Sequence, residues 1–113
     1  MKIITQSVTL NEIKAMAIAT FGNLVKAVVD VERELIAVDA ELHSDLEALL
    51  LENGSKQKNL WGINLYPEIQ GDDFVEFDSM INMRPSQGNR SRSVENEEMR
   101  KKIVSIVAKR IIR

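Results

Sequence analysis

Arginine side chains gather in one polar stretch of the chain, which reads RPSQGNRSRS over residues 84–93 and is followed by Arg100. Guanidinium groups beside the free amide groups of a helix N-terminus suit the binding of a phosphate or a carboxylate. Serine, glutamine and asparagine side chains add hydrogen-bond donors, and Gly88 gives the backbone freedom. The stretch therefore predicts an anion site, and its candidate ligand-binding residues are Arg84, Asn89, Arg90, Arg92 and Arg100.

Two features of the same stretch favour a different interpretation. The spacing does not match GxxxxGK[ST], so this is not a P-loop. Glu95, Glu97 and Glu98 also lie in or near the first turn of the helix that follows. These carboxylates already satisfy the helix dipole and repel an anion. The alternative is a solvated loop whose arginines pair with carboxylates of the same chain.

Charge is distributed unevenly along the sequence. Residues 84–113 hold nine basic and three acidic side chains, which gives +6, whereas residues 1–83 carry −8 and the whole chain −2. Such an asymmetry favours an anionic partner. It is equally consistent with a basic segment that folds back on its own acidic body, or that docks on a neighbouring subunit.

Local sequence accounts for part of the basic segment. Lys101 and Lys102 each follow a glutamate at the favourable i,i+4 spacing. Lys109, Arg110 and Arg113 lie near the end of the last helix, where the dipole favours cations. The arginines that these rules leave without a local partner are Arg84, Arg90, Arg92 and Arg100.

The basic segment lacks aromatic side chains altogether, and the aromatic content of the chain is 4%. Proteins that bind single-stranded nucleic acids stack bases on aromatic rings. The composition therefore argues against a module that reads RNA sequence. Contact with a phosphate backbone remains open, because that contact needs only cations.

The single histidine, His43, is flanked by Asp39, Glu41, Asp45 and Glu47. With these carboxylates it suggests either general acid–base catalysis or a mixed metal site. The alternative is a surface or half-buried residue just before a helix cap, since Asp45 and Glu47 suit a first helical turn. We expect no metal and no cofactor, and the catalytic residues, if the protein is an enzyme, are not identified by the sequence. No catalytic triad order, nucleophile elbow or dinucleotide fingerprint is present.

Length and composition restrict the class of protein. The 113 residues predict one domain over 1–113, with a radius of gyration near ~13 Å if compact. Hydrophobic residues at 44% and charged residues at 28% exclude disorder and a membrane-embedded chain. The absence of cysteine excludes disulfides, thiol catalysis and thiolate zinc sites. No signal or membrane segment is recognised, so we expect a cytoplasmic protein.

Hydrophobic periodicity indicates how these residues are positioned. The alternating runs predict strands over residues 2–4, 24–31, 35–38, 60–66 and 75–83. Capping boxes at Thr9–Glu12 and Ser44–Glu47 predict helices over about 10–21 and from Ser44 to near Asn53. A third helix starts at Ser93 or Asn96 and runs to the C-terminus. The order β-α-β-β-α-β-β-α predicts an α+β fold, an antiparallel sheet of about four to five strands with about three helices packed on one face.

Three stretches also carry a family resemblance: VKAVVDVE at 25–32, GSKQKNLWGINLYPE at 54–68 and FDSMINMRPSQGNRSRSVENEE at 77–98. Together they resemble a family of short bacterial and archaeal proteins catalogued only as a domain of unknown function. The resemblance covers nearly the whole chain and implies one domain in a prokaryotic cytoplasm. It implies no activity, cofactor or catalytic residue.

These observations leave three functional hypotheses. The first is a non-catalytic module that binds an anionic ligand or partner, such as a phosphate backbone, through the arginine-rich loop. The second is a homo-oligomeric structural or interaction protein, in which the basic segment docks on a neighbour's acidic body. The third is an enzyme that uses His43 or the arginine loop in an unspecified reaction.

Overall fold

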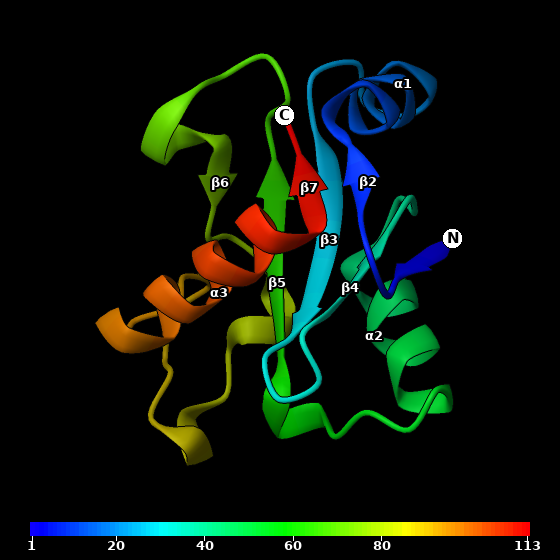
Figure 1. Cartoon of the computed structure of the whole chain (residues 1–113). Coiled ribbons are helices and arrows are strands. Elements are labelled where there is room, and N and C mark those ends of the chain that lie inside the picture. Colours follow the sequence, from blue (N-terminus) through cyan, green and yellow to red (C-terminus); the bar gives the residue numbers. More distant parts are fainter.

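A five-stranded antiparallel sheet forms the centre of the structure, a computed structural model that describes residues 1–113 (Figure 1). The strands run in the order β1-β4-β3-β5-β6 across the sheet. Their bounds are β1 Lys2–Ile4, β3 Val25–Asp30, β4 Leu35–Val38, β5 Leu60–Leu65 and β6 Val75–Glu76. A second, small sheet pairs β2 (Val8–Thr9) with β7 (Ile111–Ile112) in parallel.

Three helices complete the α+β fold, as the sequence predicts. They are α1 Leu10–Ala19, α2 His43–Glu52 and α3 Glu97–Arg110. Four short 3-10 turns lie in the connections: η1 Gln57–Asn59, η2 Gly71–Phe74, η3 Met80–Asn82 and η4 Pro85–Gln87. The radius of gyration is 12.8 Å, close to the value expected for a compact chain of this length. No helix combines the length and the apolar character that crossing a bilayer requires.

The helices cover both faces of the sheet, so the prediction of helices on one face is wrong. Ala27 and Val29 of β3 face α1 and α3 in the larger core cluster. Val28 faces the other way and packs in a second cluster with Leu46 and Leu50 of α2. Helices cover both faces because β3 is apolar at Val28 as well as at Ala27 and Val29. Both faces of this central strand can then be buried.

The first helix begins as the sequence predicts. The backbone amide of Thr9 donates to Glu12 Oε2 at 2.7 Å, and the amide of Glu12 donates to Thr9 Oγ1 at 3.2 Å. The bond from the Thr9 backbone is the main cause that lowers the pKa of Glu12. This reciprocal capping box fixes the start of α1 against β2.

The second helix lacks the predicted capping box. Its N-cap is Leu42, two residues before the predicted Ser44, and Leu42 makes no side-chain hydrogen bond, so the first helical residue is His43. Ser44 therefore lies inside the first turn instead of capping it. The end near Asn53 agrees with the prediction, since α2 ends at Glu52.

The third helix follows the Asn96 alternative. Asn96 Oδ1 accepts a hydrogen bond from the amide of Met99 at 2.8 Å and caps α3. The helix ends at Arg110 rather than at the C-terminus, because Ile111 and Ile112 pair with Val8 and Thr9. That pairing ties the two ends of the fold together beside α1 (Figure 1).

Candidate functional site

The strand predicted over residues 75–83 ends after two residues, and this creates the site. β6 covers only Val75–Glu76, so part of β5 has no strand beside it. The side chain of Asn82, which is fully buried, takes the place of that strand. Asn82 Oδ1 accepts from the amide of Gly62 at 2.8 Å, and Asn82 Nδ2 donates to the Gly62 carbonyl at 3.0 Å.

Gly62 makes this arrangement possible because it has no side chain. A Cβ atom at Gly62 would lie 2.5 Å from the Cβ of Ser79, closer than two carbons can approach. Ser79 therefore crosses directly over β5, and its amide donates to the carbonyl of Arg92 at 3.0 Å. Asn82 Nδ2 donates to the same carbonyl at 2.9 Å. These bonds hold the arginine-rich loop against the sheet edge.

Asn89, one of the five candidate ligand residues, organises the loop from inside. Only 3% of its surface is exposed. Its Nδ2 donates to the carbonyls of Asn82 and Ser93, both at 2.7 Å, and its Oδ1 accepts from the amide of Glu95 at 2.9 Å. Because the amide is used in these contacts, Asn89 shapes the loop and leaves its surface to the arginines.

Arg84 is directed inward, onto β5. Its guanidinium lies 4.1 Å above the ring centre of Trp61 and donates from Nη1 to the carbonyl of Gln57. Nε and Nη2 are buried without a hydrogen-bond partner. Burial lowers the pKa of Arg84, and the charge of Glu47 opposes that effect. Arg84 therefore anchors the loop more than it presents a charge to solvent.

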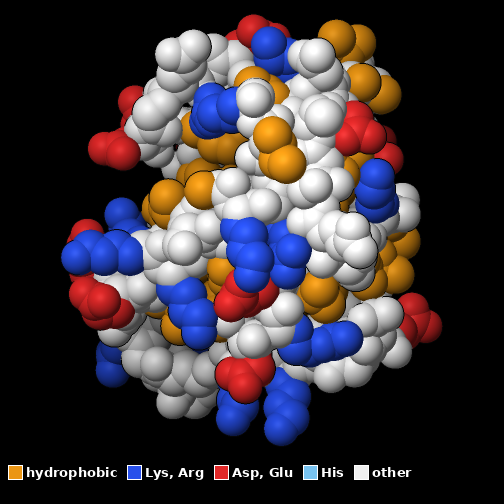
Figure 2. All heavy atoms as spheres, viewed as in Figure 1, with side chains coloured by type: hydrophobic (Ala, Val, Ile, Leu, Met, Phe, Trp, Pro, Cys, Tyr) orange, Lys and Arg blue, Asp and Glu red, His pale blue; other side chains and the backbone are white.

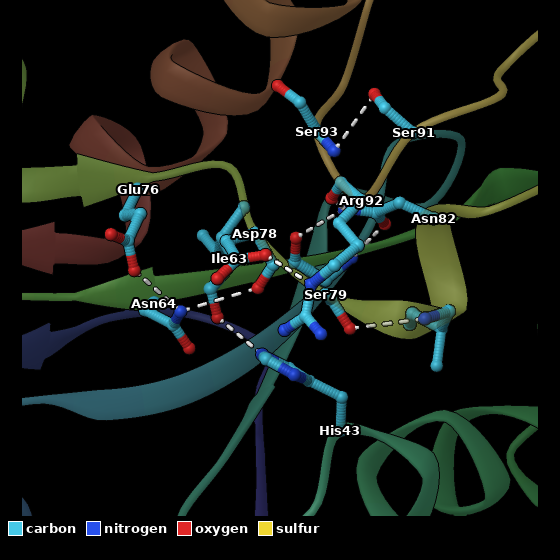
Figure 3. Close-up of polar contacts among 12 residues, drawn as sticks. His43, Ile63, Asn64, Glu76, Asp78, Ser79, Asn82, Ser91, Arg92 and Ser93 are labelled. Carbon is cyan, nitrogen blue, oxygen red and sulfur yellow. Dashed lines mark hydrogen bonds and ion pairs between the residues drawn. The ribbon is translucent and has the colours of Figure 1, made fainter.

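Arg92 and His43 approach each other from different elements (Figure 3). Arg92 Nε donates to Asp78 Oδ1 at 2.6 Å, and its terminal nitrogens point toward the His43 ring in Figure 3. His43, the first residue of α2, donates from Nε2 to the carbonyl of Ile63 at 2.8 Å. A carbonyl only accepts, so this bond fixes the proton on Nε2.

The surroundings of His43 keep the imidazole neutral at pH 7. Burial is the main cause that lowers the pKa of His43, and the nearby cations Lys26 and Arg92 lower it further. The bond to Ile63 and the charge of Asp78 act in the opposite direction. With Nε2 engaged, Nδ1 is the ring nitrogen that is left to interact with another group.

A polar chain continues from this cluster along β5. Asn64 Nδ2 donates to Glu76 Oε1 at 2.8 Å and to the carbonyl of Asp78 at 3.3 Å. The Tyr66 hydroxyl donates to the same Glu76 oxygen at 3.1 Å. Burial raises the pKa of Tyr66, and the contact with Glu76 adds to that effect. The cluster therefore contains two carboxylates, Asp78 and Glu76, besides its cations.

Arg100 occupies a different environment, on the α3 side of the loop. Its Nε donates to the carbonyl of Val94, and its Nη2 donates to Ser93 Oγ at 2.6 Å. The guanidinium lies 4.8 Å from the ring centre of Phe77. All of these partners are uncharged, so Arg100 is held in place without a direct ion pair.

A groove of about 720 Å³ runs between α3 and residues 71–77, and Arg100 lines it. Apolar side chains form the hollow at the left of Figure 2, below the lobe that contains η2. Arg113 repeats the arrangement of Arg100, because its guanidinium lies 4.3 Å from the ring centre of Phe74. Charged and apolar members of the lining include Asp72, Asp73, Phe74, Phe77, Glu97, Arg100, Lys101, Val104, Val107 and Arg113.

Most of the basic segment is free of carboxylate partners. Only three of its nine cations form ion pairs: Arg92 with Asp78, Lys101 with Glu98 at 3.7 Å and Lys109 with Glu34 at 2.7 Å. The Lys101 pair is i,i+3, so the predicted i,i+4 pairs do not form. Arg110 donates to the carbonyls of Glu34 and Gln6, and the side chain of Arg90 has no polar partner. Among the four arginines singled out, Arg92 is thus the one that forms an ion pair with a carboxylate of the chain.

The structure separates candidate residues that lie together in the sequence, and it brings together others that lie far apart in the sequence. The five candidates of the loop divide into an anchor (Arg84), a loop organiser (Asn89), an exposed cation (Arg90), a partner of the His43 cluster (Arg92) and a groove residue (Arg100). Sequence analysis missed the Arg113–Phe74 stack and the approach of His43 to Arg92. No group of three or more His, Asp or Glu side chains is placed to hold a metal ion.

Comparison with known proteins shows the family of the chain. A family model described as "Protein of unknown function (DUF5674)" matches residues 2–110. No curated protein and no solved structure matches the chain. The match spans nearly all of the chain.

Proposed function

The chain belongs to DUF5674, a family of proteins of unknown function, and we propose that it is a non-catalytic module that binds a small amphiphilic anion. The ligand lies in the groove between α3 and residues 71–77, and Arg100 holds its charged group. One observation carries the proposal: Arg100 is fixed by uncharged partners at the wall of a groove with an apolar floor. Concave, mostly apolar sites with a few placed polar groups are typical ligand sites.

Arg100 is prepared to receive an anion. A guanidinium carries five N–H donors, and Arg100 uses Nε and Nη2 in its bonds to Val94 and Ser93. Nη1 is therefore left for a carboxylate or a similar group. Because packing on Phe77 already orders the side chain, little rotamer entropy is lost on binding.

The charges of the groove favour a single negative group over a polyanion. Lys101 and Arg113 add positive charge to the lining, whereas Asp72, Asp73 and Glu97 bring the formal sum to zero. A nucleic-acid backbone requires several cations that neutralise successive phosphates. The acidic rim repels such a chain, but a monoanion can reach Arg100 without meeting all three carboxylates.

The apolar floor supplies the remaining affinity. Phe74, Phe77 and Val107 line it, and Val104 is exposed at its rim. Each buried methylene of a ligand contributes about 0.8 kcal/mol before the losses on association. A carboxylate with an alkyl chain of moderate length therefore fits the site better than a short or purely polar anion.

Binding of octanoate tests this proposal. We expect saturable binding with a dissociation constant of roughly 10 μM to 1 mM, and about tenfold weaker binding by Arg100→Gln. Lys102→Gln is the matched control, since Lys102 lies on the same helix but outside the groove lining. Val104→Trp, which fills the rim from an exposed position, blocks binding without disturbing the core.

Two further ligands define the outcomes that contradict the proposal. Octylammonium, which reverses the charge of octanoate, is expected to bind less tightly than octanoate. Heparin tested at about 50 and 200 mM salt distinguishes a polyanion site. Equal binding of octanoate by the parent protein and Arg100→Gln, or a preference for heparin that depends on Arg100, refutes the small-anion proposal.

A further inference from the structure

His43 and Arg92 come together on the face of the sheet that α2 covers, away from the groove. We propose that they form a second site, which binds a tetrahedral oxyanion, sulfate or a phosphate group, and takes up one proton as it does so. The two residues are far apart in sequence and reach this place from α2 and from the arginine-rich loop (Figure 3). This inference does not rest on the proposed groove function.

Arg92 supplies the fixed part of the site. Its bond from Nε to Asp78 Oδ1 at 2.6 Å orients the guanidinium and leaves both terminal nitrogens without a protein partner. Its side chain is 53% exposed, so these nitrogens are accessible to a ligand. A guanidinium with two free terminal nitrogens matches two oxygens of a sulfate or phosphate.

His43 supplies the part that depends on protonation. Its Nε2–H is engaged by the carbonyl of Ile63 at 2.8 Å, so a ligand can meet the ring only at Nδ1. A neutral Nδ1 has a lone pair and repels an oxyanion, whereas a protonated Nδ1–H donates to it. Binding of the anion and protonation of His43 therefore favour each other.

The charges around His43 make that proton necessary. Lys26 on β3, Asp78 after β6 and Arg92 in the loop all act on the imidazole. Glu76 lies next in the polar chain through Asn64. The two cations and two carboxylates cancel while His43 is neutral, and protonation leaves one net positive charge. On α2 itself the carboxylates nearest to His43 in sequence are Asp45 and Glu47.

Lys26 adds positive charge near the proposed oxyanion site but makes no direct contact with the oxyanion. It lies opposite Asn64 in the pairing of β3 with β5. Its ammonium group lies 5.1 Å from the ring centre of Phe21, which restrains it. The direct contacts to the oxyanion are therefore assigned to Arg92 and His43, and Lys26 acts through its charge.

Sulfate is the suitable probe, since it remains a dianion between pH 5.5 and 8.0. Any pH dependence of its binding then belongs to the protein. We expect the dissociation constant of sulfate to be at least about fivefold lower at pH 5.5 than at pH 8.0. The chain has one histidine, so its NMR resonance reports the His43 pKa alone. That pKa is expected to rise in sulfate relative to chloride at equal ionic strength.

Matched variants separate this site from a general salt effect. Arg92→Gln is expected to abolish the sulfate-specific shift of the His43 resonance, whereas Arg90→Gln, which removes an exposed charge from the same loop, leaves it intact. His43→Gln keeps a donor for Ile63 and is expected to remove the pH dependence. Arg100→Gln leaves the shift unchanged, so failure of the groove proposal and failure of this one are distinguishable.

The remaining comparisons decide the outcome. Acetate, which is planar, is expected to shift the resonance less than sulfate, and methyl phosphate at pH 5.5 distinguishes a phosphate monoester from inorganic oxyanions as the preferred ligand. Sulfate binding that is equal at both pH values overturns the proposal. So does an Arg92→Gln variant that is folded, by its amide NMR spectrum, and still shows the parent response.

Discussion

The side chain of Asn82 bonds to both backbone groups of Gly62, in the place where a longer β6 would otherwise pair with β5. The two distances are 2.8 Å to the amide and 3.0 Å to the carbonyl. Asn82 Nδ2 also reaches the carbonyl of Arg92, so one buried amide joins β5, the 77–82 segment and the arginine-rich loop. This contact therefore links the arginine-rich loop to β5.

Removal of that side chain is expected to destabilise the fold. Asn82→Ala leaves the amide and carbonyl of Gly62 buried without partners and removes one of the two bonds to the Arg92 carbonyl, and each group left unpaired costs about 1–3 kcal/mol. We expect the free energy of unfolding, measured in urea, to fall by about 2–4 kcal/mol. Asn23→Ala, at an exposed asparagine, is the control and should change it by less than about 0.5 kcal/mol.

The close approach of Ser79 to Gly62 gives a second prediction. Gly62→Ala places a methyl group 2.5 Å from the Cβ of Ser79 and should lower the free energy of unfolding by about 1–3 kcal/mol. Ser79→Gly in the same chain removes the clashing atom. A double-mutant cycle should then show a favourable coupling of about 1 kcal/mol or more. Strictly additive effects would mean that the two residues do not limit each other.

Much of the fold follows from the sequence because its determinants are local. Thr9 and Glu12 cap α1 through their own side chains, and Asn96 caps α3 in the same way. The apolar runs of β3 and β5 are long enough to require burial. These elements would form in any compact arrangement of the chain, so pattern and propensity suffice to predict them.

The errors arise where distant residues decide the local structure. Residues 75–83 alternate as a strand should, yet Gly62 and Asn82 together replace the pairing after Glu76. Val28 packs against α2 on the second face of the sheet. The approach of His43 to Arg92 depends on both of these events, so no local pattern in either segment indicates it.

The titration of His43 predicts how stability changes with pH. Its pKa in the folded protein lies below the ordinary value of 6.5, mainly because the ring is buried. The unfolded chain therefore binds more protons than the folded one as pH falls through 6.5 toward the folded pKa. We expect the free energy of unfolding to decrease over that interval, and His43→Gln to flatten the dependence.

A separate acid effect lies lower on the pH scale. Glu12, Glu34 and Glu95 have pKa values below the ordinary 4.5, through the bonds to Thr9, Lys109 and Ser91 respectively. Each contributes stability that is present above pH 4.5 and is lost as pH falls through its folded value. Urea denaturation at successive pH values separates the two ranges. A His43→Gln variant with the same slope as the parent between pH 7 and 5 would contradict the assignment to His43.

Arg84 is expected to tolerate loss of its charge better than loss of its bulk. Its guanidinium covers Trp61 at 4.1 Å, while Nε and Nη2 are buried without partners. Arg84→Met keeps an apolar cover for the ring and removes those unpaired donors, so the free energy of unfolding should change by less than about 1 kcal/mol. Arg84→Ala exposes Trp61 and should lower the free energy of unfolding by about 1–2 kcal/mol.

Fluorescence of the single tryptophan, followed through urea denaturation, reports both the stability and the exposure of the ring. Equal losses for Arg84→Met and Arg84→Ala, which both remove the charge, would show that the charge of Arg84, not its packing on Trp61, holds the loop to β5.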